Sequence, residues 1–260
     1  MNTPLPLSRR DVIASRLARG QPVRAAELAA EFEVSEDAIR RDLRALAAEG
    51  KCRRVYGGAL PMAMITHSNS VRATERPGSR RLLAWAAVDL IQHGEFVFLD
   101  RGGVNREVAD LLPQGAGISV ATNSPAIAAA LAERTDIPLI MIGGKVSMET
   151  GACIDAEAIA SVEKMNIDRC FIGSCGVSPP RLGVTDHADA LFKRSVLSRS
   201  SNCHAVITPD SFRQHTSHLI AGPSAIELVI AASSLDEDQV ASLRAAGFRL
   251  LRESGYKDVK

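Results

Sequence analysis

The chain has 260 residues, of which 46% are hydrophobic, 23% are charged and only 4% are aromatic, and its formal net charge is +1. This composition is typical of a globular protein with an aliphatic core, and the length predicts about two domains. It has neither a signal-like apolar start nor a run of about 18 apolar residues, so we expect a cytoplasmic protein with no membrane partner. The five cysteines form no Cys-x-x-Cys pair, so we expect reduced thiols and no zinc site.

Charge is distributed unevenly along the chain. Residues 1–62 carry eleven basic and eight acidic side chains, whereas the remainder carries 20 basic and 22 acidic ones. Between Ile39 and Gly58 there are six basic residues and two acidic ones. A local basic patch on a nearly neutral chain indicates a nucleic-acid-binding module joined to a second domain.

Three short helices are predicted in the first 50 residues. Ser8 is a candidate cap for a helix that ends near Arg19, and residues 25–32 form a second helix. Ser35 is a good N-cap for the third helix, and Gly50 is a typical stop signal. This arrangement predicts a helix-turn-helix whose third helix follows a tight turn at residues 33–34.

The third helix is predicted to be amphipathic. Ile39, Leu43 and Leu46 recur at helical spacing, so the arginines between them fall on the exposed face. Residues 51–60 then form a basic hairpin, and the pair is typical of a winged helix-turn-helix on DNA, since arginine donates to guanine edges and to phosphates. The residues predicted to contact DNA are Ser35, Asp37, Ala38, Arg40, Arg41, Arg44, Lys51, Arg53, Arg54, Tyr56, Gly57 and Gly58.

The pattern changes after residue 80. Residues 6–61 form the predicted winged helix-turn-helix domain, residues 62–79 a linker and residues 80–260 an α/β domain. Short apolar strands alternate there with amphipathic helices, which indicates a doubly wound, mostly parallel sheet. The predicted strands are 96–99, 118–121, 139–142, 170–173, 205–207, 228–230 and 248–251; the predicted helices are 81–92, 105–112, 125–133, 156–165, 188–199 and 237–245.

Polar residues and glycines follow several of these strands. Asp100 ends one strand before a Gly-Gly pair, residues 122–124 end the next, and Gly143 and Gly144 end the third. Strand ends that lead into helix N-termini carry free backbone N–H groups, and glycines let an anion approach closely. We therefore expect an anion-binding pocket at this edge of the sheet.

Residues 6–61 resemble the helix-turn-helix domain of the DeoR-type bacterial transcriptional repressors. The resemblance is carried by Ser-Glu-Asp-Ala-Ile-Arg-Arg-Asp-Leu at 35–43 and by Arg-Val-Tyr-Gly-Gly-Ala at 54–59. The sequence departs from the family at Ala38, where a threonine is usual, so a hydroxyl for phosphate contact is missing. Arg24 stands where a small capping residue is common, so we expect a poorly capped second helix.

The resemblance extends over the second domain, and it implies a fold similar to sugar-phosphate isomerases and a phosphorylated sugar as effector. Where the family has Ser-Gly-Thr-Thr after its aspartate, this chain has Arg-Gly-Gly-Val at 101–104, and Ser211 replaces a usual lysine. Arg101 or Arg213 is a candidate for the lost positive charge. The residues expected to bind the effector are Asp100, Arg101, Gly102, Gly103, Asn105, Thr122, Asn123, Ser124, Gly143, Gly144, Lys193, Asp210 and Ser211.

These patterns predict a transcriptional regulator, most simply a homo-oligomeric repressor of a carbohydrate operon, with operator DNA and a sugar phosphate as partners and no cofactor. One alternative is an isomerase-like enzyme that uses Asp100, Asp186, Lys193 and Asp210; it is disfavoured because a sensor joined to a DNA reader works by differential binding. An activator, a constitutive regulator and a nucleoid-type protein with a non-functional sensor stay open. His215 and His218 lack a third metal ligand, so no metal is expected.

Overall fold

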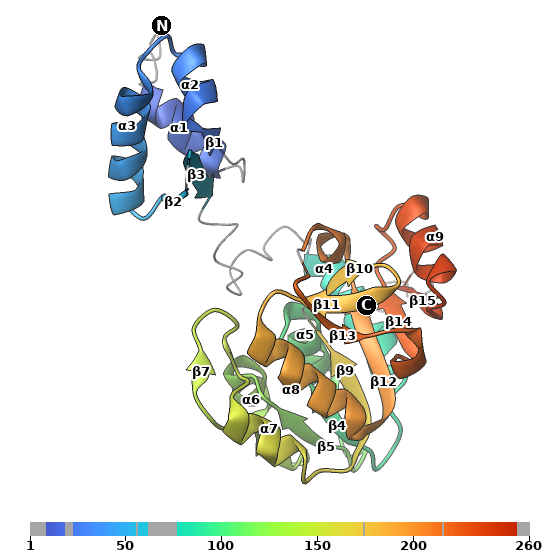
Figure 1. Ribbon diagram of the computed structural model, residues 1–260. Helices are drawn as coiled ribbons and strands as arrows, with labels where there is room; N and C mark the ends of the chain where they lie inside the picture. Colours follow the sequence, from blue (N-terminus) through green and yellow to red (C-terminus); the bar gives the residue numbers. More distant parts are fainter. Residues whose placement is uncertain are drawn as a thin grey trace, which may run out of the picture. The chain divides into compact units, whose positions relative to one another are not determined.

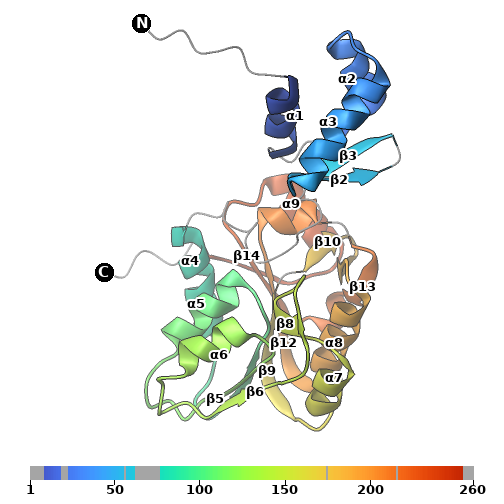
Figure 2. The same ribbon diagram turned by 90° about the vertical axis from the view of Figure 1, so that its left-hand side faces the viewer.

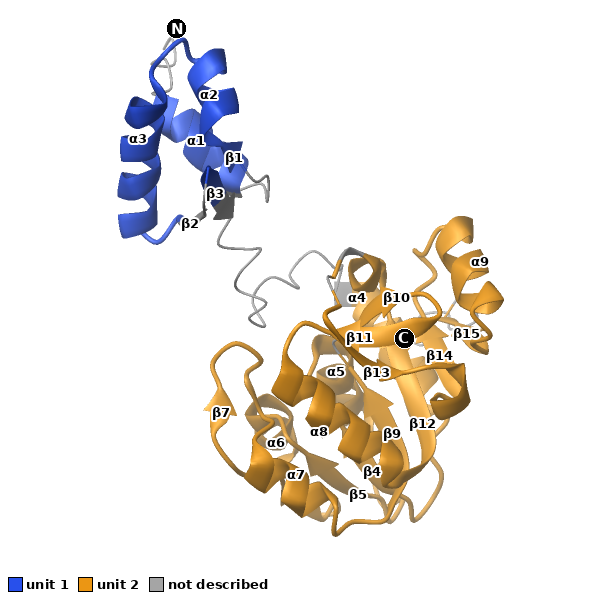
Figure 3. Ribbon diagram, viewed as in Figure 1, with its two compact units in different colours: residues 1–71 blue, residues 72–260 orange. Residues whose placement is uncertain are grey.

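The computed structural model describes residues 9–18, 23–55, 57–61, 77–173, 175–214 and 216–253 (Figure 1). The chain divides into two compact units, residues 1–71 and residues 72–260 (Figure 3). Within the described ranges, no helix is long and apolar enough to cross a membrane.

The first unit is a three-helix bundle with a small antiparallel sheet. Its elements are α1 Arg9–Ala18, β1 Val23–Arg24, α2 Ala25–Glu31, α3 Glu36–Ala48, β2 Cys52–Val55 and β3 Gly58–Pro61, with strand order β1-β3-β2. The predicted helices and hairpin are confirmed for the described residues. The proposed cap at Ser8 lies outside them. The turn between α2 and α3 contains Glu33 at φ 52°, a backbone conformation that few residues other than glycine adopt.

A compact apolar core holds this unit together. Every helix contributes aliphatic side chains spaced three or four residues apart, and Cys52 and Ala59 add the wing to the same cluster. Its fully buried members include Ile13, Leu17, Leu28, Ile39, Leu43 and Leu46. Packing of the buried face of α3 therefore fixes the orientation of this helix, which carries the exposed arginines.

The second unit contains a seven-stranded, wholly parallel sheet of order β15-β14-β12-β9-β4-β5-β6. Its strands are β4 Phe96–Leu99, β5 Ser119–Thr122, β6 Leu139–Met141, β9 Ile167–Ile172, β12 Ser200–Ile207, β14 Leu228–Ala231 and β15 Leu250–Arg252. The helices are α4 Pro77–Val88, α5 Gly103–Leu111, α6 Pro125–Leu131, α7 Ala156–Val162, α8 His187–Ser198 and α9 Glu237–Ala245. The predicted α/β architecture is confirmed.

Helices cover both faces of this sheet. Figure 2 shows α4, α5 and α6 together on one face and α7 with α8 on the other. The central strands are buried on both faces, which explains their continuous apolar runs such as Phe-Val-Phe-Leu in β4. As in parallel sheets generally, all strand carboxyl ends meet at one edge, and the predicted polar residues lie there.

Several elements differ from the sequence-based expectation. A small antiparallel sheet, β10 Gly176–Ser178, β11 Arg181–Val184 and β13 His218–Ala221, and a hairpin, β7 Val146–Ser147 with β8 Ala152–Cys153, were not predicted. These strands are two to four residues long, too short to show a periodic pattern. Strand β12 begins at Ser200, earlier than expected, because its polar first half pairs with β9.

Candidate functional site

The exposed face of α3 carries its basic side chains. The Ser35 hydroxyl accepts a hydrogen bond from the Ala38 N–H at 3.3 Å, so the predicted N-cap is present. Ile39, Leu43 and Leu46 face the core, whereas Arg40, Arg41 and Arg44 are exposed. Because the apolar residues occupy one side of α3, the three arginines point to the opposite, exposed side.

The first turn of α3 holds two of these arginines along the helix. The Arg40 guanidinium pairs with Glu36 at 2.7 Å and with Asp37 at 3.3 Å, and Arg41 Nε donates to the Asp37 backbone carbonyl at 3.3 Å. Exposed ion pairs such as those of Arg40 are weak and screened by salt.

Ion pairs join α1 and α2 to the rest of the bundle. Arg9 of α1 pairs with Asp42 of α3 at 2.6 Å, and Arg10 pairs with Glu49. Arg16 pairs with Glu31 of α2, which raises the pKa of the arginine and lowers that of the glutamate through their hydrogen bond. The first two contacts hold α1 against α3 and its C-terminal cap, and the third joins α1 to α2.

The wing is attached to α2 through backbone contacts. Strand β3 pairs with β1, and a Cβ atom on Gly58 would overlap the Val23 carbonyl oxygen. The Ala25 N–H donates to the Gly57 carbonyl at 2.8 Å. Arg24 makes no side-chain cap, as expected, and the wing turn takes over part of that function.

The predicted DNA contacts in the wing are described only in part. Lys51 is exposed and pairs with Glu49 at 2.9 Å, and Gly57 lies exposed at the turn with φ 82°. The side chains of Arg53 and Arg54, and Tyr56 as a whole, lie outside the described residues.

In the second unit, strand register brings the predicted polar residues together. Leu99 of β4 pairs with Thr122 of β5 and with Phe171 of β9. The residues that follow these strands therefore lie side by side, with Asp100 next to Asn123 on one side and near Gly173 on the other. The Gly173 N–H donates to Asp100 Oδ2 at 3.0 Å.

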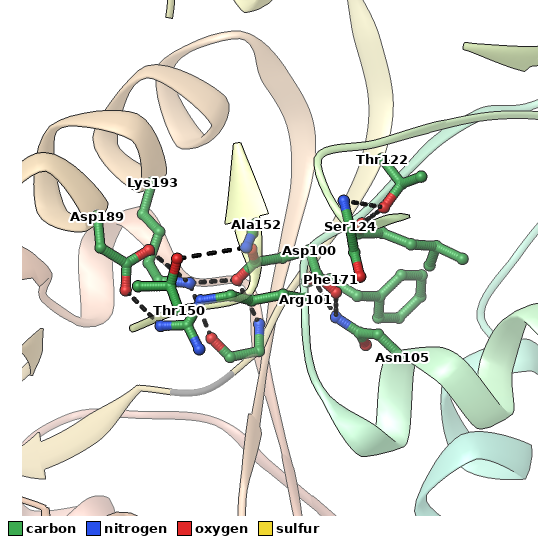
Figure 4. Close-up of polar contacts among 12 residues, drawn as sticks. Asp100, Arg101, Asn105, Thr122, Ser124, Thr150, Ala152, Phe171, Asp189 and Lys193 are labelled. Carbon is green, nitrogen blue, oxygen red and sulfur yellow. Dashed lines mark hydrogen bonds and ion pairs between the residues drawn. The ribbon is translucent and has the colours of Figure 1, made fainter. Parts of the chain in front are cut away.

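Behind this edge lies a buried ion cluster of Asp100, Arg101, Asp189 and Lys193 (Figure 4). Lys193 Nζ contacts Asp100, donates to the Gly173 carbonyl at 2.9 Å and lies 3.4 Å from Asp189. Arg101 Nη2 donates to Asp189 Oδ2 at 2.7 Å. Two cations thus face two carboxylates, and the cluster is neutral overall.

The cluster keeps its charges despite burial. Burial opposes ionisation of Asp189, but Lys193 and Arg101 outweigh it, and the pKa of Asp189 lies below its usual value. Likewise, burial opposes the charge on Arg101, but Asp189 and Asp100 raise its pKa above the ordinary value. The neighbouring Cys175 thiol stays neutral, because burial raises its pKa to about 11.

A pocket opens beside this cluster, at the N-terminus of α5. It is lined by Arg80, Gly102, Gly103, Val104, Asn105, Gly173, Val206, Thr208, Asp210, Ser211 and Gln214. Five predicted effector residues are among them: Gly102, Gly103, Asn105, Asp210 and Ser211. Asp100, Arg101 and Lys193 are not lining residues and belong to the buried cluster.

Arg80 is the residue that sequence reasoning missed. It lies in the first turn of α4, just before the helix that was predicted at residues 81–92, and it belongs to no sequence motif that indicates a binding site. Its guanidinium lies over Gly103, where a Cβ atom would be only 3.3 Å from Arg80 Nη1. Gly102 caps α5 without a side chain, so the positive end of the helix faces the pocket beside Arg80.

On the far side of the pocket, the short helix η3 Pro209–Arg213 carries Asp210 and Ser211. Thr208 and Ser211 form a reciprocal capping box, so the Ser211 hydroxyl accepts the Thr208 N–H at 3.3 Å. The side chain of Arg213, the second candidate for a replacement cation, lies outside the described residues, as does His215.

The other predicted effector residues lie away from the pocket lining. Thr122 donates its hydroxyl to the Leu99 carbonyl at 2.7 Å and accepts the Ser124 N–H, which shapes the turn into α6. Asn123 is fully buried. Gly143 and Gly144 are exposed after β6, and Gly144 leaves room for Asp155, the N-cap of α7.

Comparisons with known proteins agree with this two-part architecture. Residues 9–62 match the model of the DeoR-like helix-turn-helix domain, and residues 75–233 match that of the DeoR C terminal sensor domain. A protein of Escherichia coli O157:H7 named as an aga operon transcriptional repressor is 29% identical, over 94% of this chain and 92% of its own. The glycerol-3-phosphate regulon repressor of Escherichia coli K12 is 26% identical over 72% and 75%. Among solved structures, ribose 5-phosphate isomerase A from Neisseria gonorrhoeae aligns over 53% of this chain and 54% of its own, with 17% identity and a TM-score of 0.39.

Proposed function

The chain belongs to the DeoR family of transcriptional regulators, and we propose that it is a repressor of a carbohydrate operon whose DNA binding is relieved by an anionic sugar derivative. It is a DNA-binding regulator with a small-molecule sensor domain, and relatives with this architecture are named as regulators and not as enzymes. One of them is named for the aga operon and another for the glycerol-3-phosphate regulon, which supports the proposal of a repressor that responds to a small metabolite.

For the DNA side, we propose that α3 enters the major groove with Arg40, Arg41 and Arg44 facing the bases and phosphates. Ser35, Asp37 and Ala38 lie at the N-terminus of the same helix, where the backbone approaches a phosphate. The wing, from Lys51 through Gly58, would follow the adjacent backbone. One module reads only a short site, so we propose a homo-oligomer on paired half-sites.

The DNA assignment is tested by a gel shift at fixed salt with the double variant Arg40→Glu and Arg41→Glu. We expect loss of specific binding, because four units of charge change beside the phosphates. The matched control reverses Arg244 and Arg249, which are exposed in the sensor unit, and keeps the same net charge. Equal affinity of both double variants for the operator would show that α3 is not the recognition helix.

For the sensor side, the proposal depends on one observation: Arg80 lies over Gly103 at the uncapped N-terminus of α5, inside a pocket. A guanidinium and a helix N-terminus are two independent anion-binding groups. The further predicted residues Gly102, Asn105, Asp210 and Ser211 complete that pocket, while Thr122, Asn123, Ser124, Gly143 and Gly144 would shape the neighbouring turns.

The variant Arg80→Gln tests the sensor assignment. We expect it to bind operator DNA normally but to stay bound in the presence of the effector. Arg81→Gln is the matched control, because Arg81 is the exposed neighbour that pairs with Glu107 at 3.8 Å. If the Arg80 variant released DNA at the same effector concentration as the control, the pocket would not be the effector site.

A further inference from the structure

We infer that the pocket takes a polyhydroxylated monocarboxylate, that is a sugar acid, in preference to a phosphate ester. This inference rests on the proposed function, because it names the chemical class of ligand for the same pocket. Two observations carry it: the balance of charge around the pocket, and a buried amide oxygen in its lining that has no hydrogen-bond partner among the described residues.

The charge of the pocket matches a monoanion. Among the described side chains that line it, Arg80 and Asp210 are the ones that ionise, and their formal charges cancel. The N-terminus of α5 adds roughly half a positive charge. A carboxylate brings one negative charge, whereas a phosphate monoester brings about 1.5 to 2 and would have to face the Asp210 carboxylate.

The buried ion cluster adds no further positive charge. Arg101 is bound to Asp189 and Lys193 to Asp100, and all four side chains are at most 6% exposed. Freeing either cation for a phosphate would leave a carboxylate buried and unpaired. Both cations of the buried ion cluster are therefore paired within it.

The N-terminus of α5 also lacks the hydroxyls that suit three phosphate oxygens. Gly102, Gly103 and Val104 carry none, and a Cβ atom on Gly103 would lie only 3.3 Å from Arg80 Nη1.

One buried atom in the pocket lining can receive a ligand hydroxyl. Asn105 Oδ1 has no hydrogen-bond partner within the described ranges, and Asn105 is only 1% exposed. Unsatisfied buried polar atoms are costly and rare. The Asn105 amide is held in place, because its Nδ2 donates to the Asp100 and Phe171 carbonyls at 2.8 Å each.

An amide oxygen is an acceptor, which suits a hydroxyl donor of the ligand. A sugar acid would thus place its carboxylate at Arg80 and a hydroxyl of its chain at Asn105.

Calorimetry on the full-length protein tests this with three matched pairs: ribonate and gluconate, ribose 5-phosphate and glucose 6-phosphate, and ribitol and sorbitol. We expect the sugar acids to bind at least tenfold more tightly than the phosphates, with the polyols weakest, and to release operator DNA. Tighter binding of the phosphates would overturn the inference while the proposed function stood. If no compound bound or changed DNA affinity, both would fail.

Asp210→Asn tests the charge argument directly. Removing the carboxylate should bring the phosphates at least tenfold closer to the sugar acids in affinity, whereas Asp238→Asn on α9 should change nothing. An unchanged preference in the Asp210 variant would contradict the argument. So would a tenfold loss of gluconate affinity in Arg213→Gln, since a second cation would then belong to the site.

Discussion

Lys193 supports the sensor unit from outside the pocket lining. Its ammonium group contacts Asp100, Asp189 and the Gly173 carbonyl at once, with the side chain fully buried. We expect Lys193→Met to destabilise the sensor unit by about 3–5 kcal/mol, because it leaves buried carboxylates under-compensated. Urea unfolding followed by fluorescence of Trp85, the only tryptophan, measures this. Lys164→Met on the surface is the control and should stay within about 0.5 kcal/mol.

A second prediction concerns His204 and the dependence of folding stability on pH. His204 is buried beside Arg169, with 2.6 Å between His204 Nε2 and Arg169 Nη1; burial and this cation lower its pKa to about 4. In the unfolded chain the imidazole takes up a proton near pH 6.5, so between pH 6.5 and 4 the unfolded state binds more protons. Stability contributed by the neutral histidine is therefore lost as pH falls through this window.

Urea unfolding at pH 7, 6 and 5 checks this prediction before most carboxylates titrate. The wild-type chain should lose stability across the three values, and His204→Gln should show a flatter profile. An equally steep profile in the variant would place the titrating group elsewhere.

At the scale of elements, the wing and the start of α2 are joined by backbone contacts. Gly58 lets β3 approach β1 closely, and the adjacent Gly57 carbonyl accepts the first free N–H of α2. Gly58→Ala should push the strands apart, so amide exchange should rise in β1, β3 and the first turn of α2, and operator affinity should fall. Gly57→Ala, which meets no neighbour but keeps a positive φ, should raise exchange at the wing turn alone. Equal exchange patterns in both variants would show that close strand approach is unimportant.

At the scale of the whole molecule, DNA reader and sensor are separate units, so their communication is a free energy that links two binding events. If the effector lowers operator affinity by a given factor, operator DNA must lower effector affinity by the same factor. Calorimetric titration of the effector with and without saturating operator, beside gel shifts with and without effector, should return equal factors. Unequal factors at equilibrium would mean that the effector acts on assembly of the oligomer instead.

Local sequence patterns were enough to predict the helices of the DNA-binding unit and the parallel α/β architecture of the sensor unit. Ser35, the stripe of Ile39, Leu43 and Leu46, and the apolar strand of residues 96–99 act through contacts a few residues apart, so periodicity and capping rules were sufficient. Glycines 102 and 103 indicated an anion site for the same local reason.

The surroundings of the sensor residues depend on contacts that are distant in the sequence. Asp100, Arg101 and Lys193 are predicted binding residues, and the structure adds that they pair with carboxylates or cations from chain segments some 90 residues away. Arg80 joined the pocket because α4 packs beside α5, which no local pattern encodes. Pairing of charges and lining of a pocket depend on long-range packing, and that information is distributed over the whole chain.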